Sequence, residues 1–296
     1  MVATVITTGP LAAAFWSYGF MQRALIAALL IGLVAPSVGI YLVQRRLALI
    51  GDGLGHVALA GVAVGLVTSA SPVWTALAVA VFGAVIVEWI RTTGRAGGDS
   101  ALAIMFYGGI ATGLVVVSQA PDGTPANLNA YLFGAITTTS WSDVAIFLAL
   151  SVVVLTVTVG LRRWLFAASN DDEFARASGL PVLRLNLLVA VLTAVTVVVS
   201  MRVVGLLLVS ALMVVPVAAA QQFTRSFAHT MAAAIAIGVA SALGGVVTSR
   251  YASTPSGPTI ILVAIGIFVL AALSRSLVAR GSWHSSPADP DGGPTR

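Results

Sequence analysis

Long apolar segments, separated by short breaks, run through almost the whole chain. The breaks carry turn residues, as in Ser71-Pro72, Pro121-Asp122-Gly123 and Pro255-Ser256-Gly257-Pro258. Most segments approach the length of about 20 residues that a transmembrane helix needs. None shows the alternation of apolar and polar residues that is typical of a membrane barrel. Nine such segments can be drawn, at 20–43, 51–69, 72–91, 101–119, 142–163, 183–201, 204–221, 228–248 and 257–274.

The composition supports a membrane protein. Hydrophobic residues make up 58% of the chain and charged residues 8%, whereas soluble domains carry about 25% charge. The mean hydropathy is +1.02. Cysteine is absent, which excludes disulfides, thiolate metal sites and iron–sulfur clusters. We therefore predict an all-α integral membrane protein, a polytopic bundle of about eight to nine transmembrane helices with broken or re-entrant segments.

The basic residues predict the orientation, because inner loops of membrane proteins are enriched in them. All fifteen are arginine, and they flank the apolar segments rather than forming one basic face. With the carboxyl terminus inside, nine spans place the amino terminus outside, and an extra helix from Val2 to Trp16 would reverse that end. The outer side then holds Arg23, Arg202 and Arg250, and the inner side holds the other twelve.

An acid and an imidazole four residues apart interrupt this apolar background. The apolar stretch Val57 to Thr68 is too short to cross a bilayer, and extending it draws Asp52 and His56 into the membrane. At this spacing both side chains lie on one helical face, about 6 Å apart. A carboxylate and a neutral imidazole suit Mn²⁺, Fe²⁺ or Zn²⁺. In the other interpretation, Asp52 caps a helix end and His56 faces water.

The surroundings of this pair suggest transient binding. Gly51, Gly53 and Gly55 favour a broken or re-entrant helix of the kind that transporters use. Two ligands are too few for tight binding, so a second chain, water or backbone carbonyls must complete the shell. Weak coordination suits conduction. Transport should fall as His56 becomes protonated below about pH 6.5.

Other polar residues have simpler interpretations. Glu88 and Arg91 form a local pair, His229 is interfacial, and Arg202 extends its side chain to the outer interface. Small residues at helix-packing spacing predict close helix contacts. These are Gly61 with Gly65, Gly109 with Gly113, and Ser241 with Gly245.

The longest inner connection, about 165–183, contains a second candidate site. Asp171 can cap a short helix that ends at Gly179, and Pro181 prevents its continuation. Phe174, Ala175 and Ala177 give this helix a small apolar surface. Either it docks on a soluble partner, or it lies on the bilayer surface.

Some functions are excluded by missing residues. A Walker A loop requires lysine, and this chain has none, so ATP-driven transport needs a separate ATPase. The chain also lacks a His-Glu-x-x-His motif and a recognisable nucleophile motif. An enzyme is therefore not supported.

At this point the motifs match a known family. The run from Arg45 to Gly61, RRLALIGDGLGHVALAG, resembles the signature of permease subunits of zinc/manganese/iron ABC importers. Supporting stretches are Tyr131–Gly134, the Asp172-to-Pro181 loop, Val204–Pro216 and Pro255–Gly257. The resemblance covers about residues 18–275.

The resemblance implies a bacterial cytoplasmic-membrane permease that forms a homodimer. It implies as partners two cytoplasmic ATPase subunits and an extracytoplasmic metal-binding protein, with Zn²⁺ or Mn²⁺, and also Fe²⁺, as cargo. Asp52 and His56 fall on the metal path. The residues expected to couple to the ATPase are Asp172, Glu173, Phe174, Ala175 and Gly179. The permease domain covers 20–275, between an interfacial extension at 1–19 and a disordered cytoplasmic tail at 276–296.

From these motifs we expect the binding protein to deliver the metal ion near the outer loop 120–141. The ion then passes the constriction formed by Asp52 and His56, while the ATPase tilts the bundle between outward-open and inward-open states. Two alternatives remain. An ABC permease for a metal chelate, such as a siderophore or cobalamin, needs a wide aromatic path and no direct ligands. An ion-coupled secondary carrier needs no ATPase and predicts inverted repeats.

Overall fold

The computed structural model describes residues 18–93, 98–119, 128–134 and 139–283, and within them every regular element is a helix. Eight helices are long and apolar enough to cross a membrane. They are α2 (Gly19–Gln44), α3 (Ile50–Val67), α4 (Pro72–Thr93), α5 (Gly98–Ser118), α7 (Trp141–Gly160), α10 (Val182–Met201), α12 (Phe227–Ala252) and α13 (Ser256–Trp283). The predicted polytopic helical bundle is confirmed.

One of the nine predicted segments, 204–221, is shorter than a span in the structure. Residues 202–208 form turns, and only Val209–Ala220 is helical, as the 12-residue α11. Helix α3, in contrast, runs without a break through Gly51, Gly53 and Gly55. The prediction of a broken helix at Asp52 is therefore wrong. Gly51 instead gives room to α11, because a Cβ there would lie 2.5 Å from Met213 Cε and 3.1 Å from Ser210 Cβ.

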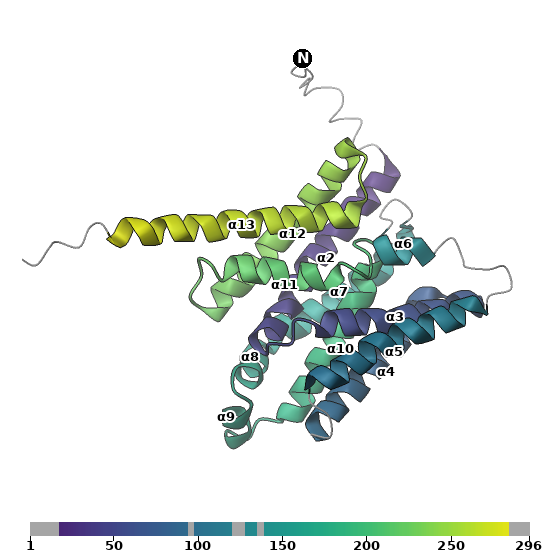
Figure 1. Cartoon of the computed structure of the whole chain (residues 1–296), viewed down its shortest axis with the longest axis horizontal. Helices are drawn as coiled ribbons and strands as arrows, with labels where there is room; N and C mark the ends of the chain where they lie inside the picture. The colour runs from purple at the N-terminus through teal and green to yellow at the C-terminus, as the bar shows by residue number, and fades with distance from the viewer. Residues whose placement is uncertain (1–17, 94–97, 120–127, 135–138, 284–296) are drawn as a thin grey trace, which may run out of the picture.

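Figure 1 shows α3, α4 and α5 packed together in one part of the bundle and α2, α12 and α13 in another, with α11 between them. Three short helices were not assigned by hydropathy as separate elements. Helix α6 (Leu128–Phe133) lies beside the turns at 202–208. Helices α8 (Arg162–Asn170) and α9 (Asp172–Ala177) lie far from α6 (Figure 1).

Two helix ends that carry arginine meet at Glu88. Arg45 follows α2 and Arg91 ends α4, and both pair with the buried Glu88, at 3.6 and 2.7 Å. Within α13, Arg275 donates a hydrogen bond to Gln222, which follows α11. The predicted Glu88–Arg91 pair is confirmed, and Arg45 is an additional partner. This clustering is consistent with the orientation predicted from the arginine counts.

Three of the motifs that carry the family resemblance meet at one junction. The Leu206 N–H donates to the Tyr131 carbonyl at 2.9 Å, which joins α6 to the turns at 202–208. Gly134 and Gly205 both adopt positive φ, at 78° and 90°. A Cβ on Gly257 would lie 1.9 Å from the Val204 carbonyl oxygen. Glycine is required at these positions because the backbones touch.

The terminal segments follow the predictions only in part. Helix α13 continues to Trp283, so residues 276–283 of the expected tail are helical. Residues 284–296 and 1–17 lie outside the described residues, and so does the additional helix considered at Val2–Trp16. Within the outer loop 120–141, residues 120–127 and 135–138 are also outside them.

The small-residue pairs pack as predicted, and Gly109 offers a direct test. A Cβ on Gly109 would lie 2.6 Å from the carbonyl carbon of His56, whereas a Cβ on Gly108 would meet nothing within 4 Å. We expect Gly109→Ala to lower the free energy of unfolding by about 1–3 kcal/mol, because backbone must move. Gly108→Ala is the matched control and should be neutral or slightly stabilising. Thermal unfolding in detergent measures both, and equal midpoints would contradict the packing.

Candidate metal path at mid-depth in the bundle

Asp52 and His56 lie on the first two turns of α3, deep within the bundle. The backbone of His56 and Val57 packs on Gly109, near the middle of α5. The Val57 side chain packs on Gly83, near the middle of α4. His56 is therefore level with the midpoints of two long helices, and Asp52 is about one turn closer to the arginine-bearing end. The pair therefore lies near mid-depth along the bundle, with His56 buried and Asp52 half-buried.

The geometry also decides between the two interpretations of the pair. The N-cap of α3 is Leu49, and no side chain caps this helix. Asp52 instead accepts a hydrogen bond from the hydroxyl of Ser210, in the first turn of α11. His56 is only 9% exposed, so it does not face water. A capping aspartate with a solvated histidine is therefore wrong.

Asp52 is placed where a carboxylate charge is tolerated. It lies in the first turn of α3 and contacts the first turn of α11, so two helix amino termini direct their partial positive charge towards it. This stabilises the anion in an apolar environment. The same field opposes a bound cation, which favours brief occupancy over tight binding.

His56 has an uncommitted ring nitrogen. Its Nδ1 is buried and has no hydrogen-bond partner among the described residues. The ring packs edge-on against Phe106 of α5, with centroids 4.2 Å apart and planes at 71°. Buried polar atoms are normally satisfied, so an unpartnered imidazole nitrogen needs an explanation. A metal ion that enters from the Asp52 side would supply one.

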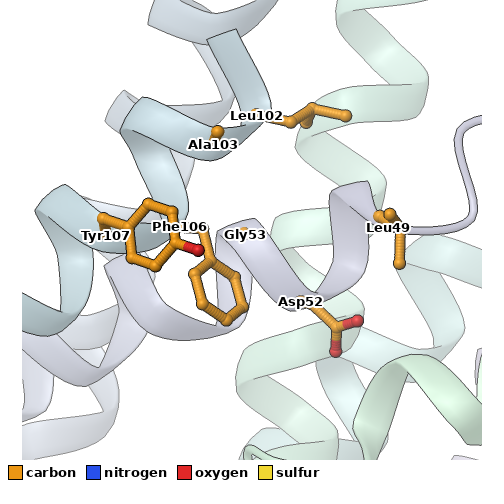
Figure 2. Close-up of a pocket in the computed structure, with 7 residues that line it drawn as sticks. All are labelled: Leu49, Asp52, Gly53, Leu102, Ala103, Phe106 and Tyr107. Atoms are coloured by element: carbon orange, nitrogen blue, oxygen red, sulfur yellow. The ribbon is translucent and has the colours of Figure 1, made fainter. Parts of the chain in front are cut away.

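The carboxylate borders a groove on the surface of the bundle. Figure 2 shows this groove between α3 and α5, with Asp52 on α3 and the rings of Phe106 and Tyr107 on α5. Its volume is about 280 Å³, and Leu49 and Tyr107 at its rim are both more than two-thirds exposed. No group of three or more metal-binding side chains occurs within the described residues. Asp52 and His56 are therefore the two candidate ligands that α3 offers.

The second candidate site folds as predicted. Asp171 accepts hydrogen bonds from the N–H groups of Glu173 and Phe174 and so caps α9, and Gly179 adopts a φ of 79° after it. Phe174 is 67% exposed, whereas Ala175 is buried. The apolar surface expected of this helix is therefore mainly the Phe174 ring.

This loop is tied to the helices that lead to the metal path. Gln44, the last residue of α2, donates to Asn170 at 2.8 Å, and Asn186 of α10 donates to Asp172 at 3.4 Å. Burial lowers the pKa of Arg45, and the Glu88 and Asp172 carboxylates oppose that shift. The connection from α2 to α3 thus lies within the electrostatic reach of α9.

The predicted surroundings of Arg202 are wrong, whereas His229 lies at an exposed position as predicted. Arg202 does not extend freely to the interface: it pairs with Asp143 at 2.7 Å and lies over the Tyr131 ring, 5.5 Å from its centroid. Its partner is 59 residues away, so no local pattern indicates it. His229 is exposed and bonds Ser226, as an interfacial residue would.

The fold and this site define a multi-pass helical membrane transport protein. Residues 17–275 match the family described as ABC 3 transport family, and the chain belongs to this family. It is accordingly the membrane-spanning permease of an ABC transporter, located in the bacterial inner membrane. The resemblance seen in the sequence is confirmed.

Several known proteins are similar over most of their length. The manganese transport system membrane protein MntC of Halalkalibacterium halodurans is 31% identical, covering 86% of this chain and 87% of MntC. The high-affinity zinc uptake system membrane protein ZnuB of Haemophilus influenzae is 27% identical, covering 85% of this chain and 96% of ZnuB. The structure of PsaBC from Streptococcus pneumoniae in complex with Fab matches with a TM-score of 0.80 and 25% identity. That match covers 88% of this chain and 93% of the PsaBC chain.

Proposed function

We propose that this permease carries a divalent transition metal ion, zinc or manganese and also iron, into the cell, powered by a separate ATPase. The observation that carries the proposal is the placement of Asp52 and His56 one turn apart on α3 at mid-depth, with Nδ1 of His56 unpartnered among the described residues. Oxygen and imidazole nitrogen together suit these ions. The similarity to manganese and zinc transport proteins supports the same cargo.

The metal site requires a second copy of the chain. Asp52 borders a groove whose other lining is mostly apolar, and a carboxylate there is costly if the groove faces lipid. A homodimer that brings two such grooves together covers both carboxylates. It also raises the strong ligands from two to four, which is the number that zinc commonly takes.

The ATPase acts through α9. We place its docking surface at Asp172, Glu173, Phe174 and Gly179, where Phe174 projects and the cap at Asp171 fixes the helix start; the buried Ala175 packs beneath this surface rather than on it. Movement of α9 reaches α2 through Asn170, the last residue of the adjoining α8, which accepts a hydrogen bond from Gln44. From Gln44 the movement passes along the chain to α3 and Asp52. A dimer of ATPase subunits would act on both copies.

Replacing Phe174 with aspartate should release the ATPase. Phe174 is exposed in the isolated permease, so the change leaves its fold intact and removes the apolar contact that docking buries. We expect the affinity for the ATPase to fall by about tenfold or more. Co-purification and ATPase-dependent uptake measure the loss. The exposed Phe223, replaced in the same way, is the control, and normal ATPase binding by Phe174→Asp would place the docking surface elsewhere.

Delivery takes place at the opposite end, near α6 and the outer loop 120–141, from an extracytoplasmic metal-binding protein. That loop contains no arginine of its own, and Arg202, which lies over its Tyr131 ring, is offset by the Asp143 carboxylate, so repulsion of an approaching cation is small.

Uptake assays test the function as a whole. Cells that lack this protein should lose uptake of radioactive zinc or manganese, and the chain should restore it without any added chelator. Uptake should stop on ATP depletion even when the proton gradient is kept. A requirement for a chelate, or uptake that survives ATP depletion, would select one of the alternatives.

A further inference from the structure

Ser210 is the one residue outside α3 whose side chain holds the Asp52 carboxylate among the contacts of the described residues. It is 8% exposed and lies in the first turn of α11, and its hydroxyl donates a hydrogen bond to Oδ1 of Asp52. The approach depends on Gly51. A Cβ there would lie 2.5 Å from Met213 Cε and 3.1 Å from Ser210 Cβ. Helix α11 is thus packed directly on α3 beside the metal path.

This contact differs from those of Ser241 and Thr193, two other buried helical hydroxyls. Ser241 donates to the Ile237 carbonyl and Thr193 to the Val189 carbonyl, each four residues earlier in its own helix. Such bonds satisfy the hydroxyl locally. Ser210 instead reaches across to another helix, 158 residues away in the chain. Its hydroxyl therefore acts on Asp52.

The contact restricts how Asp52 can bind a cation. The terminal torsion of an aspartate is broad, so a free carboxylate can present one oxygen or both. Because Oδ1 already accepts from Ser210, it is the weaker donor to a cation, and the carboxylate is held so that Oδ2 is the better one. Calcium takes six to eight oxygens and commonly binds carboxylates with both. Zinc and other transition ions are satisfied by fewer donors, including imidazole.

We propose that Ser210 is a positioning residue of the metal path: it orients the Asp52 carboxylate, favours binding through one oxygen rather than both, and so discriminates against calcium. The inference rests on the proposed function, because it requires that Asp52 binds the transported ion. It assigns to α11, and to the turns at 202–208 that precede it, a part in ion selectivity.

Competition between manganese and calcium tests the role of Ser210. Free Mn²⁺ can be measured by electron paramagnetic resonance during titration of the purified full-length permease, with Ca²⁺ added as competitor. For Ser210→Ala, we expect the ratio of calcium to manganese affinity to rise by about tenfold over wild type. A ratio does not depend on how much of the protein is folded, so a general loss of stability would leave it unchanged.

Two further variants complete the experiment. Ser210→Thr keeps the hydroxyl and should retain the wild-type ratio, and Ser241→Ala removes a buried serine elsewhere and should do the same. An unchanged ratio in Ser210→Ala, or an equal rise in Ser210→Thr, would overturn the role of Ser210. Asp52→Asn separates this from the proposed function: if it binds Mn²⁺ as wild type does, the metal path itself is misplaced.

Discussion

Metal uptake should be lost when Asp52 is replaced with asparagine or His56 with glutamine. Each change keeps the size and polarity of the side chain but removes a strong ligand from the path. Loss of an outer-shell partner alone costs about tenfold to a hundredfold in metal affinity, so loss of a ligand should reduce uptake by at least about a hundredfold. Radioactive zinc and manganese uptake at matched expression measures the effect.

The control for these two variants is an exposed histidine at the start of α12. His229 is exposed and bonds Ser226, so His229→Gln should transport normally. All three variants should also co-purify with the ATPase, because none of them lies on α9. Near-normal uptake by Asp52→Asn at normal expression would remove Asp52 from the path.

The second large effect concerns the buried ion pair where the arginine-bearing ends of α2 and α4 meet. Glu88→Gln leaves Arg45, whose side chain is 9% exposed, without its carboxylate. Breaking a buried pair from one side typically costs about 3–5 kcal/mol, because a charge remains buried and unpaired. We expect a loss of folded stability of that size, measured by thermal unfolding in detergent.

Two comparisons separate charge from packing in this experiment. Arg176→Gln breaks an exposed pair with Asp172, at 63% and 41% side-chain exposure, and should change stability by less than about 1 kcal/mol. Replacing both partners, in Arg45→Met with Glu88→Leu, should recover most of the stability lost in Glu88→Gln. If the double variant is as unstable as Glu88→Gln, packing rather than unpaired charge explains the loss.

The sequence predicts the long helices well, for a physical reason. A membrane span must satisfy its backbone within one helix, so apolar length alone indicates where each helix runs. The segment 20–43 was expected and α2 covers Gly19–Gln44. Capping chemistry was equally local, as Asp171 and α9 illustrate.

The parts that sequence could not predict depend on contacts between distant segments. The turns at 202–208 are shaped by backbone bonds to α6, which hydropathy does not record. Gly51 was interpreted as a helix breaker, but its missing Cβ allows α11 to pack closely on α3. The sequence does not distinguish these two roles, because both require a residue without a side chain. The placement of Asp52 and His56 one turn apart on α3 followed from their spacing, whereas the contact of Asp52 with Ser210 left no local signal.

The most direct test of the account is to identify the ligands of a transported ion. Pulsed electron paramagnetic resonance of Mn²⁺ bound to the purified permease detects nitrogen coupling from a coordinated imidazole. The account predicts this coupling in wild type and in His229→Gln, and its loss in His56→Gln. A nitrogen signal that persists unchanged in His56→Gln, or its absence in wild type with Mn²⁺ bound, would contradict a metal path through Asp52 and His56.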